Sequence, residues 1–243
     1  MRAMFRAVAV AMLLIVAAQG VSAAEKLRLK GIRGTDDRKL ERTQKFPWSA
    51  IGRVNVRGRC VGFCTETLIV QSTVLMAAHC FWNKRSRRWA NPSSIDYLAA
   101  YSLSRYRAHS KVKSYRLSDP DLPNLAAIKK DSREDWAILE LEKSVGDKVG
   151  FLPMIALKGT KIAQAGYSKD KPHVLNVNET YSNTARRDPM LQEDCDATFG
   201  DSGSPILARD RDKIGVGALN VAVGSRNGKS VGIAILLRKG AVK

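Results

Sequence analysis

The stretch Gly200-Asp201-Ser202-Gly203-Ser204-Pro205 places one serine between two glycines. A serine hydroxyl is a weak nucleophile at neutral pH, so it needs a general base and hydrogen-bond donors for the oxyanion it creates. Glycines on both sides of Ser202 allow the sharp turn that brings the backbone close to a substrate carbonyl. The N–H groups of Gly200 and Ser202 are the expected oxyanion donors. The same six residues would also suit an ordinary turn, so the other catalytic groups must come from elsewhere in the chain.

Two further segments supply a histidine and an aspartate. An apolar strand ends in the histidine in Val74-Leu75-Met76-Ala77-Ala78-His79-Cys80, and an aspartate begins a second apolar strand in Asp135-Trp136-Ala137-Ile138-Leu139-Glu140-Leu141. In the His-Asp-Ser mechanism the imidazole takes the serine proton, and the aspartate orients the imidazole and stabilises its charged form. Singly, the histidine would suit a structural site and the aspartate a strand cap. Together, in this order, they predict a triad of His79, Asp135 and Ser202.

These residues resemble the motifs of the chymotrypsin-fold serine endopeptidases, and the chain is most similar to the bacterial trypsin-like and glutamyl-endopeptidase-like branch. The three matching segments are Ala77-Ala78-His79-Cys80, Asp135-Trp136-Ala137-Ile138-Leu139 and Gly200 to Pro205. Ser204, where animal trypsins usually carry glycine, fits the bacterial branch. The similarity runs from about Gly34 to near the C-terminus, so it covers most of the chain.

The folded part of the chain is predicted to be all-β. Ten short β-rich runs lie between turn signals, and no long stretch has a helical period. The runs are Ala50–Val56, Thr67–Ala77, Tyr97–Tyr101, Val112–Leu117, Trp136–Leu141, Ile162–Tyr167, His173–Val177, Ile206–Ala208, Ile214–Val223 and Val231–Leu237. The resemblance implies two six-stranded antiparallel β-barrels, residues 45–142 and 143–243, with the active site in the cleft between them.

The first 23 residues are typical of a signal peptide. Arg2 and Arg6 form a basic region, residues 7–18 are apolar, and Val21-Ser22-Ala23 is a small-residue cleavage site. The apolar part is short for a membrane span, although an uncleaved anchor is the alternative. We therefore expect a periplasmic or secreted protein with no integral membrane segment after cleavage. Residues 24–44 are polar and are a candidate propeptide or N-terminal segment, with processing points after Lys30 and Arg33.

Four cysteines agree with an oxidising compartment. The resemblance implies a disulfide between Cys64 and Cys80, which would hold the His79 loop on its neighbouring strand. Cys60 and Cys195 remain, and their pairing is inferred by exclusion. No Cys-x-x-Cys motif or Cys/His cluster indicates zinc, so neither a metal site nor a cofactor is expected.

Asp201 has two alternative partners by resemblance. In trypsin-like enzymes the residue before the serine pairs with a newly freed N-terminal amine, and this pairing orders the oxyanion loop. In relatives that need no activation, the same aspartate pairs with an arginine. The sequence alone leaves both alternatives open.

Asp196 is the candidate for substrate binding. It lies six residues before Ser202, where trypsin-like enzymes place the aspartate at the floor of the pocket that receives Arg or Lys. A structural role for Asp196 is the alternative, because Ala218-Leu219-Asn220-Val221 lacks the glycines that form the pocket walls of trypsins. Cleavage after glutamate is disfavoured. None of the histidines, His79, His109 and His173, lies on the strand that carries the pocket histidine of glutamyl endopeptidases.

The chain is strongly basic, with a formal net charge of +18. Removal of residues 1–23 takes away two basic residues and no acidic one, which leaves +16. The basic residues gather in 84–88, 105–116 and 209–213. A solvated basic face is one interpretation, and attraction to an anionic surface or polyanion is the other. A protein or peptide substrate is expected, and the oligomeric state is not predicted.

Three functions are compatible with these observations. The first is a secreted serine endopeptidase that forms an acyl-enzyme on Ser202, with a preference for Arg or Lys before the scissile bond if Asp196 lines the pocket. The second is a catalytically silent binding module that acts through its basic surface, although the intact triad argues against it. The third is an esterase, but α/β-hydrolases carry their triad in the order Ser, Asp, His, which is not the order here.

Overall fold

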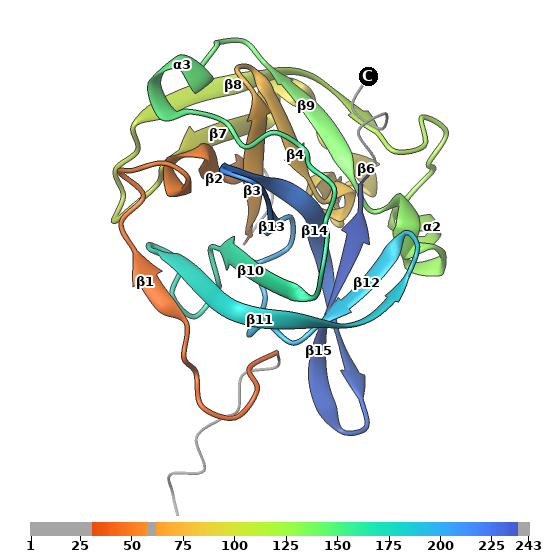
Figure 1. Ribbon diagram of the computed structural model, residues 1–243. Helices are drawn as coiled ribbons and strands as arrows, with labels where there is room; N and C mark the ends of the chain where they lie inside the picture. Colours follow the sequence, from red (N-terminus) through yellow and green to blue (C-terminus); the bar gives the residue numbers. More distant parts are fainter. Residues whose placement is uncertain (1–30, 58–61, 238–243) are drawn as a thin grey trace, which may run out of the picture.

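Two closed antiparallel β-barrels make up most of the described chain (Figure 1). The structure is a computed structural model that describes residues 31–57 and 62–237. The prediction of an all-β protein with two six-stranded barrels is confirmed. The predicted signal peptide, residues 1–23, lies outside the described residues.

The first barrel closes in the order β2-β3-β4-β9-β8-β7. Its strands are β2 (Ile51–Val56), β3 (Phe63–Val70), β4 (Thr73–Met76), β7 (Ile95–Ala99), β8 (Ala108–Leu117) and β9 (Ala137–Leu141). Apolar residues recur at every second position in β7, and these side chains are buried. This period of two directs one side of each strand into the barrel, where Leu68, Leu75 and Leu139 are fully buried.

The second barrel is built from β10, β11, β12, β13, β14 and β15. Their bounds are β10 (Lys161–Gly166), β11 (Leu175–Arg187), β12 (Met190–Glu193), β13 (Pro205–Asp210), β14 (Lys213–Arg226) and β15 (Lys229–Leu236). The sheet runs β11-β10-β13-β14-β15-β12, and the additional pairing of β11 with β12 closes it. Two long antiparallel strands, β14 and β15, are the longest hairpin of this barrel and project from it in Figure 1.

The segment before the first barrel packs on the second. Strand β1 (Lys39–Glu41) pairs antiparallel with β11, where Lys39 lies opposite Val177. Within the predicted propeptide region, residues 39–41 therefore form an additional edge of the second barrel's sheet. The chain then crosses to the first barrel through the 3₁₀ turn η1 (Trp48–Ala50).

Most predicted strands are present, with three differences. The run Thr67–Ala77 is two strands, because a turn at Gln71 and Ser72 separates β3 from β4. Strand β11 continues ten residues beyond the predicted end at Val177, and β12 has no counterpart among the predicted runs. Both differences lie in a polar stretch without strand periodicity, where pairing with neighbouring strands supplies the backbone hydrogen bonds.

Short helical turns connect the strands. They are η2 (Ala78–Phe81), η3 (Pro92–Ser94), α2 (Leu125–Lys130), η4 (Ser132–Glu134) and α3 (Gly146–Val149), and a small hairpin joins β5 (Trp82–Asn83) to β6 (Arg88–Trp89). Within residues 31–57 and 62–237, none of the helices has both the length and the apolar character needed to cross a membrane.

Candidate active site

His79 and Asp135 form a close pair at one end of the first barrel. Strands β4 and β9 are neighbours, with Met76 opposite Ala137, so the residues that follow β4 lie beside those that precede β9. The Asp135 carboxylate accepts the backbone N–H of His79 on Oδ1 at 2.8 Å, and its Oδ2 lies 2.7 Å from the His79 Nδ1. Both oxygens therefore hold the same residue, one through its backbone and one through its ring.

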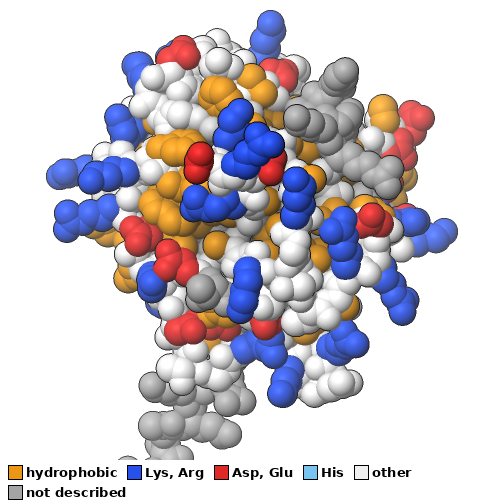
Figure 2. Space-filling view, in the orientation of Figure 1, with side chains coloured by type: hydrophobic (Ala, Val, Ile, Leu, Met, Phe, Trp, Pro, Cys, Tyr) orange, Lys and Arg blue, Asp and Glu red, His pale blue; other side chains and the backbone are white. Residues whose placement is uncertain are grey.

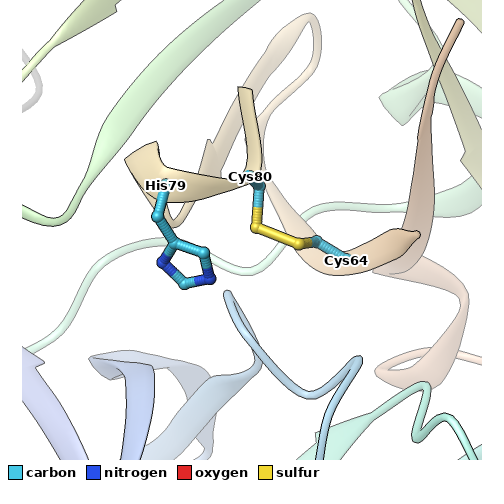
Figure 3. A group of neighbouring side chains, drawn as sticks. All are labelled: Cys64, His79 and Cys80. Carbon is cyan, nitrogen blue, oxygen red and sulfur yellow. A yellow bond between two sulfur atoms is a disulfide. The ribbon is translucent and has the colours of Figure 1, made fainter. Parts of the chain in front are cut away.

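This arrangement determines which nitrogen of the His79 ring carries the proton. Asp135 is only 4% exposed, and a buried carboxylate at Nδ1 favours the tautomer that carries its proton there. The Nε2 atom is then left as the acceptor. Figure 3 shows the His79 ring beside the Cys64–Cys80 disulfide, with a turn from the blue part of the chain below it.

The predicted disulfide between Cys64 and Cys80 is confirmed. It joins β3 to the turn η2, with a Cα–Cα distance of 6.3 Å (Figure 3). The sulfurs lie close to the His79 ring, and the three side chains form a cluster of potential metal ligands. Since both sulfurs are bonded to each other, neither is a thiolate, and His79 is left as the one ordinary ligand of the cluster.

The loop around Ser202 is packed against the disulfide-linked strand. The Ser202 carbonyl accepts the N–H of Thr65 at 3.0 Å, and the Thr65 hydroxyl donates to the Gly200 carbonyl at 3.0 Å. A Cβ at Gly203 would lie 2.1 Å from the Thr65 carbonyl oxygen and 3.2 Å from the Ala77 nitrogen. Because Ala77 is two residues before His79, these contacts bring Ser202 to the histidine.

The loop that carries Ser202 is thus packed against β3 and against the residues just before His79. Among the described residues, His79 and Ser202 do not share a direct hydrogen bond, whereas His79 and Asp135 do. Catalytic hydrogen bonds of this kind are often long in ligand-free enzymes and tighten when substrate binds.

The backbone donors of the loop divide into two groups. The N–H groups of Asp201, Gly203 and Ser204 donate to the carbonyls of Thr198, Asn220 and Asp201, respectively. The N–H groups of Gly200 and Ser202 have no acceptor among the described residues. These two are the predicted oxyanion donors, and both are available to a ligand.

Asp201 is held by hydrogen bonds rather than by a direct ion pair. Its Oδ2 accepts the Ser168 hydroxyl at 2.7 Å and the Thr198 N–H at 2.8 Å. Burial raises the pKa of this carboxyl to about 6, although both hydrogen bonds act in the opposite direction. In the described chain Asp201 pairs directly with neither of the predicted partners, an N-terminal amine or an arginine.

Asp196 is buried against the N-terminal segment. Its Oδ1 accepts the backbone N–H of Arg33 at 2.6 Å, and its Oδ2 has no hydrogen-bond partner among the described residues. The Ala197 N–H donates to the Gly31 carbonyl at 3.3 Å, so the two chain segments run side by side here. One oxygen of the predicted substrate-binding residue is therefore engaged by the protein itself.

Cys195 does not agree with the predicted bridge to Cys60. It is a free thiol that is buried in the core of the second barrel, next to Leu191, Ile206 and Ala234. This position points its side chain into the barrel rather than towards the first barrel. Cys60 itself lies outside the described residues. Pairing by exclusion was wrong here because the number of cysteines in a sequence does not show which way each side chain faces.

Three residues that support the loop were not predicted. Thr65, Ser168 and Asn220 bond it from three different strands or loops, and Asn220 alone makes three of these bonds. Ser168 follows the buried Tyr167, and Thr65 follows Cys64 of the predicted disulfide. These neighbouring residues mark the part of the chain that is involved. A single polar residue in a sequence, however, does not show which group it will bond.

The other two histidines are engaged away from this site. His109 Nε2 lies 3.0 Å from Asp96, and His173 Nδ1 lies 2.8 Å from the hydroxyl of Tyr101. Neither contacts the loop around Ser202. On the face shown in Figure 2, Lys and Arg side chains are spread over the whole surface with acidic side chains among them, not gathered in one patch.

Comparison with known proteins gives a consistent result. A family model described as Trypsin matches residues 37–239. No curated protein matches the chain in sequence. Among solved structures, the chain is similar to a Glu endopeptidase in complex with MPD, with a TM-score of 0.71 and 22% identity over 86% of this chain and 95% of that one.

Two other solved structures have the same fold. The thermostable serine protease AL20 from an extremophilic microorganism has a TM-score of 0.63 and 20% identity, and the match covers 79% of this chain and 93% of that one. The protease Anisep from Arthrobacter nicotinovorans has a TM-score of 0.58 and 19% identity, over 80% and 92% of the two chains. At these identities the likeness establishes the fold, and substrate preference does not transfer.

Proposed function

The chain belongs to the trypsin family, and on that premise we propose that it is a secreted endopeptidase that cleaves peptide bonds through an acyl-enzyme on Ser202. The observation that carries this proposal is the pairing of both Asp135 oxygens with His79, together with a loop whose Gly200 and Ser202 N–H groups have no acceptor in the described part of the chain. A general base that is oriented by a carboxylate, with donors ready for an oxyanion, is the equipment of acyl transfer.

The proposed steps follow from this arrangement. The Ser202 Oγ attacks the substrate carbonyl while His79 Nε2 takes the hydroxyl proton. The N–H groups of Gly200 and Ser202 bind the oxyanion. The peptide C–N bond then breaks, and His79 gives its proton to the leaving amine. A water molecule attacks the resulting ester by the same route, which releases the acid and restores Ser202.

A preference for Arg or Lys before the scissile bond is the finer part of the proposal. The unpaired Oδ2 of the buried Asp196 supports it, because a buried carboxylate oxygen without a partner favours a cation. The bond from Arg33 to Oδ1 supports a structural role instead. Asp196→Asn separates the two: a loss of the preference at unchanged stability supports substrate binding, whereas a lower stability with the preference retained supports the structural role.

The N-terminal contacts bear on processing. Gly31 and Arg33 bond to Ala197 and Asp196, and Lys39 begins the strand β1. Of the two candidate cleavage points, the one after Lys30 leaves all of these contacts in the mature protein. We therefore place the end of a removable segment there and treat the residues from Gly31 onwards as part of the folded enzyme. Mass spectrometry of the secreted protein tests this boundary.

A periplasmic or secreted location remains part of the proposal. The Cys64–Cys80 disulfide supports it, because disulfides persist in oxidising compartments. Fractionation of cells that express the full chain, with residues 1–23 deleted in a matched control, tests the location.

Labelling with a fluorophosphonate probe tests the chemistry. We expect one covalent adduct on Ser202, identified by mass spectrometry, with loss of the adduct in Ser202→Ala and a large fall in labelling rate in His79→Ala. A folded protein without any adduct would contradict the endopeptidase and leave binding through the basic surface as the function to test. In that case the probe is a heparin column, with elution compared before and after Gln replacement of Arg209, Arg211 and Lys213.

A further inference from the structure

A buried ion cluster on the N-terminal segment has no part in the proposed chemistry. The side chain of Arg38 is 0% exposed and lies between two carboxylates. It donates to Asp36 from Nε and Nη2, both at 2.8 Å, and to Asp170 from Nη1 at 3.2 Å and Nη2 at 2.6 Å. Lys171 adds a further bond to Asp36 at 2.6 Å. A buried arginine that satisfies two carboxylates fixes the position of both.

Asp170 belongs to a loop that touches the nucleophile loop directly. Two residues before it, the Ser168 hydroxyl donates to Asp201 at 2.7 Å. One residue before it, the Lys169 N–H donates to the Phe199 carbonyl at 2.6 Å. The loop of residues 168–171 is closed by its own bond from the Lys171 N–H to the Ser168 carbonyl at 3.0 Å. A shift of Asp170 is therefore a shift of the groups that hold residues 199 and 201.

The same loop forms one wall around Gly200. This glycine has a φ of +99°, and a Cβ there would lie 2.4 Å from the Tyr167 carbonyl oxygen and 3.1 Å from the Lys169 nitrogen. The backbone conformation of Gly200 decides where its N–H points. That N–H is one of the two proposed oxyanion donors, so its direction depends on how residues 167–169 are held.

The charges favour the same coupling. Asp201 is fully buried and has no direct cationic partner in the described chain, and its pKa is raised by burial. The nearby positive charge of Arg38 lowers the pKa of Asp201 and so favours its ionised form. Asp170 acts in the opposite direction. Without Arg38, the negative charges of Asp36 and Asp170 would have only Lys171 to balance them. Asp170 would still lie near a third carboxylate, that of the buried Asp201.

We propose that Arg38 is a positioning residue for the oxyanion loop, acting through Asp170 and the Ser168–Asp201 hydrogen bond. The N-terminal segment thereby becomes a support of the active site. Only the expected effect on turnover rests on the proposed function. The structural part of the inference, that Arg38 holds residues 199–201 in place, does not depend on the proposed function.

A guanidinium suits this position because it has five donors in one plane and can bond two carboxylates at once. Lysine keeps the charge but is a point donor. Arg38→Lys should therefore recover only part of what Arg38→Gln loses. Asp170→Asn breaks the same link from the other side, and its effect should not add to that of Arg38→Gln, because the two changes remove one interaction.

The first experiment measures peptide hydrolysis per labelled Ser202 in Arg38→Gln, with the fluorophosphonate probe counting the active sites. Counting removes any contribution from unfolded protein. We expect kcat to fall on the order of 10- to 100-fold with little change in KM, as for a misplaced transition-state group. Lys39→Ala is the matched control, since Lys39 is the next residue, is exposed and pairs with Glu179. It should leave kcat unchanged. A wild-type kcat per site in Arg38→Gln, with only a lower Tm, would overturn the proposal.

The second experiment is hydrogen exchange of the peptide that covers residues 198–203, compared between the wild type and Arg38→Gln. Faster exchange in the variant, at unchanged exchange in the first barrel, is expected. Unchanged exchange would overturn the proposal even if activity fell. If the wild type gave no Ser202 adduct, the proposed function would fail, and this exchange measurement alone would decide the role of Arg38.

Discussion

The first barrel holds His79 with one buried carboxylate, a disulfide and an apolar core, whereas the second barrel holds Ser202 within a larger set of buried polar and charged side chains. On the first side, η2 is linked to β3 through Cys64–Cys80, and Phe81 beside it is fully buried. In the second barrel, which carries Ser202, many of the buried side chains are polar. They are Gln164, Ser168, Asn176, Asn178, Glu193, Asp196, Thr198, Asp201, Ser204 and Asn220.

This difference has a physical consequence. Apolar packing and a covalent bond do not depend on protonation, although the first barrel also has two buried carboxyls, Asp135 beside His79 and Glu66 in β3. Buried carboxyls depend on protonation and on the groups that neutralise them. The Ser202 side has more buried carboxyls, Glu193, Asp196 and Asp201, so it should respond more strongly to pH and to changes in the N-terminal segment.

The largest expected effect comes from the histidine side. Asp135→Asn keeps the shape of the side chain but places an amide where Nδ1–H needs a full acceptor, which favours the wrong tautomer of His79. We expect kcat to fall on the order of 10⁴-fold with the fold intact. Peptide hydrolysis and a thermal melt measure the two quantities. Activity within tenfold of wild type would contradict the assignment of Asp135.

Gly200→Ala tests the geometry of the serine side. The added Cβ would clash with the Tyr167 carbonyl at 2.4 Å, and φ at this position is +99°. The loop must move, so we expect the loss of one oxyanion donor, worth about 10²- to 10³-fold in kcat. Gly228→Ala is the control, because it also has a positive φ, +72°, but open space around it. Equal effects of the two changes on kcat would argue against a role for Gly200.

Removal of the disulfide tests the covalent support of the first barrel. Cys64 and Cys80 are 16 residues apart, and closing a loop of this length stabilises a fold by about 3 kcal/mol. Cys64→Ser with Cys80→Ser should lower the free energy of unfolding by that amount in urea. Cys195→Ala, which removes a buried free thiol, should cost less. If reductant left the urea midpoint of the wild type unchanged, the disulfide would not be the support that we describe.

Glu193 is one source of pH dependence in the second barrel, beside Asp201. It is fully buried with Oε1 unpaired, and burial raises its pKa from 4.5 to about 7. Between these two values the unfolded chain releases the proton while the folded protein keeps it, so stability falls as pH rises. Above pH 7 the loss is complete, and it amounts to at most about 3 kcal/mol.

Glu193→Gln removes this titration. Urea unfolding at pH 5 and pH 7.5 should therefore differ less in the variant than in the wild type. The wild type should be the less stable of the two only at the higher pH. A wild-type protein that gains stability from pH 5 to 7.5, with the variant following the same course, would contradict the assignment.

The catalytic motifs were visible in the sequence because each combines a reactive residue with its local context. His79 ends an apolar strand, Asp135 begins one, and Ser202 lies between glycines, so strand periodicity and turn chemistry marked all three. The Cys64–Cys80 disulfide was predicted from the resemblance to the chymotrypsin-fold serine endopeptidases. The strands of the first barrel were predicted better than β11 and β12, because alternating apolar residues mark the former and polar residues fill the latter.

By itself, the sequence determined the fold class and one disulfide, and it is the source of the proposed triad and oxyanion donors. Each depends on a residue and its immediate neighbours. The tertiary structure decided the rest: that Asp196 bonds the N-terminal segment, that Cys195 faces the barrel core, and that Arg38 lies beside Asp170. Those contacts join residues that are up to 163 positions apart. Buried polar groups take whichever partner the closed barrels bring within reach, and no local pattern encodes that choice.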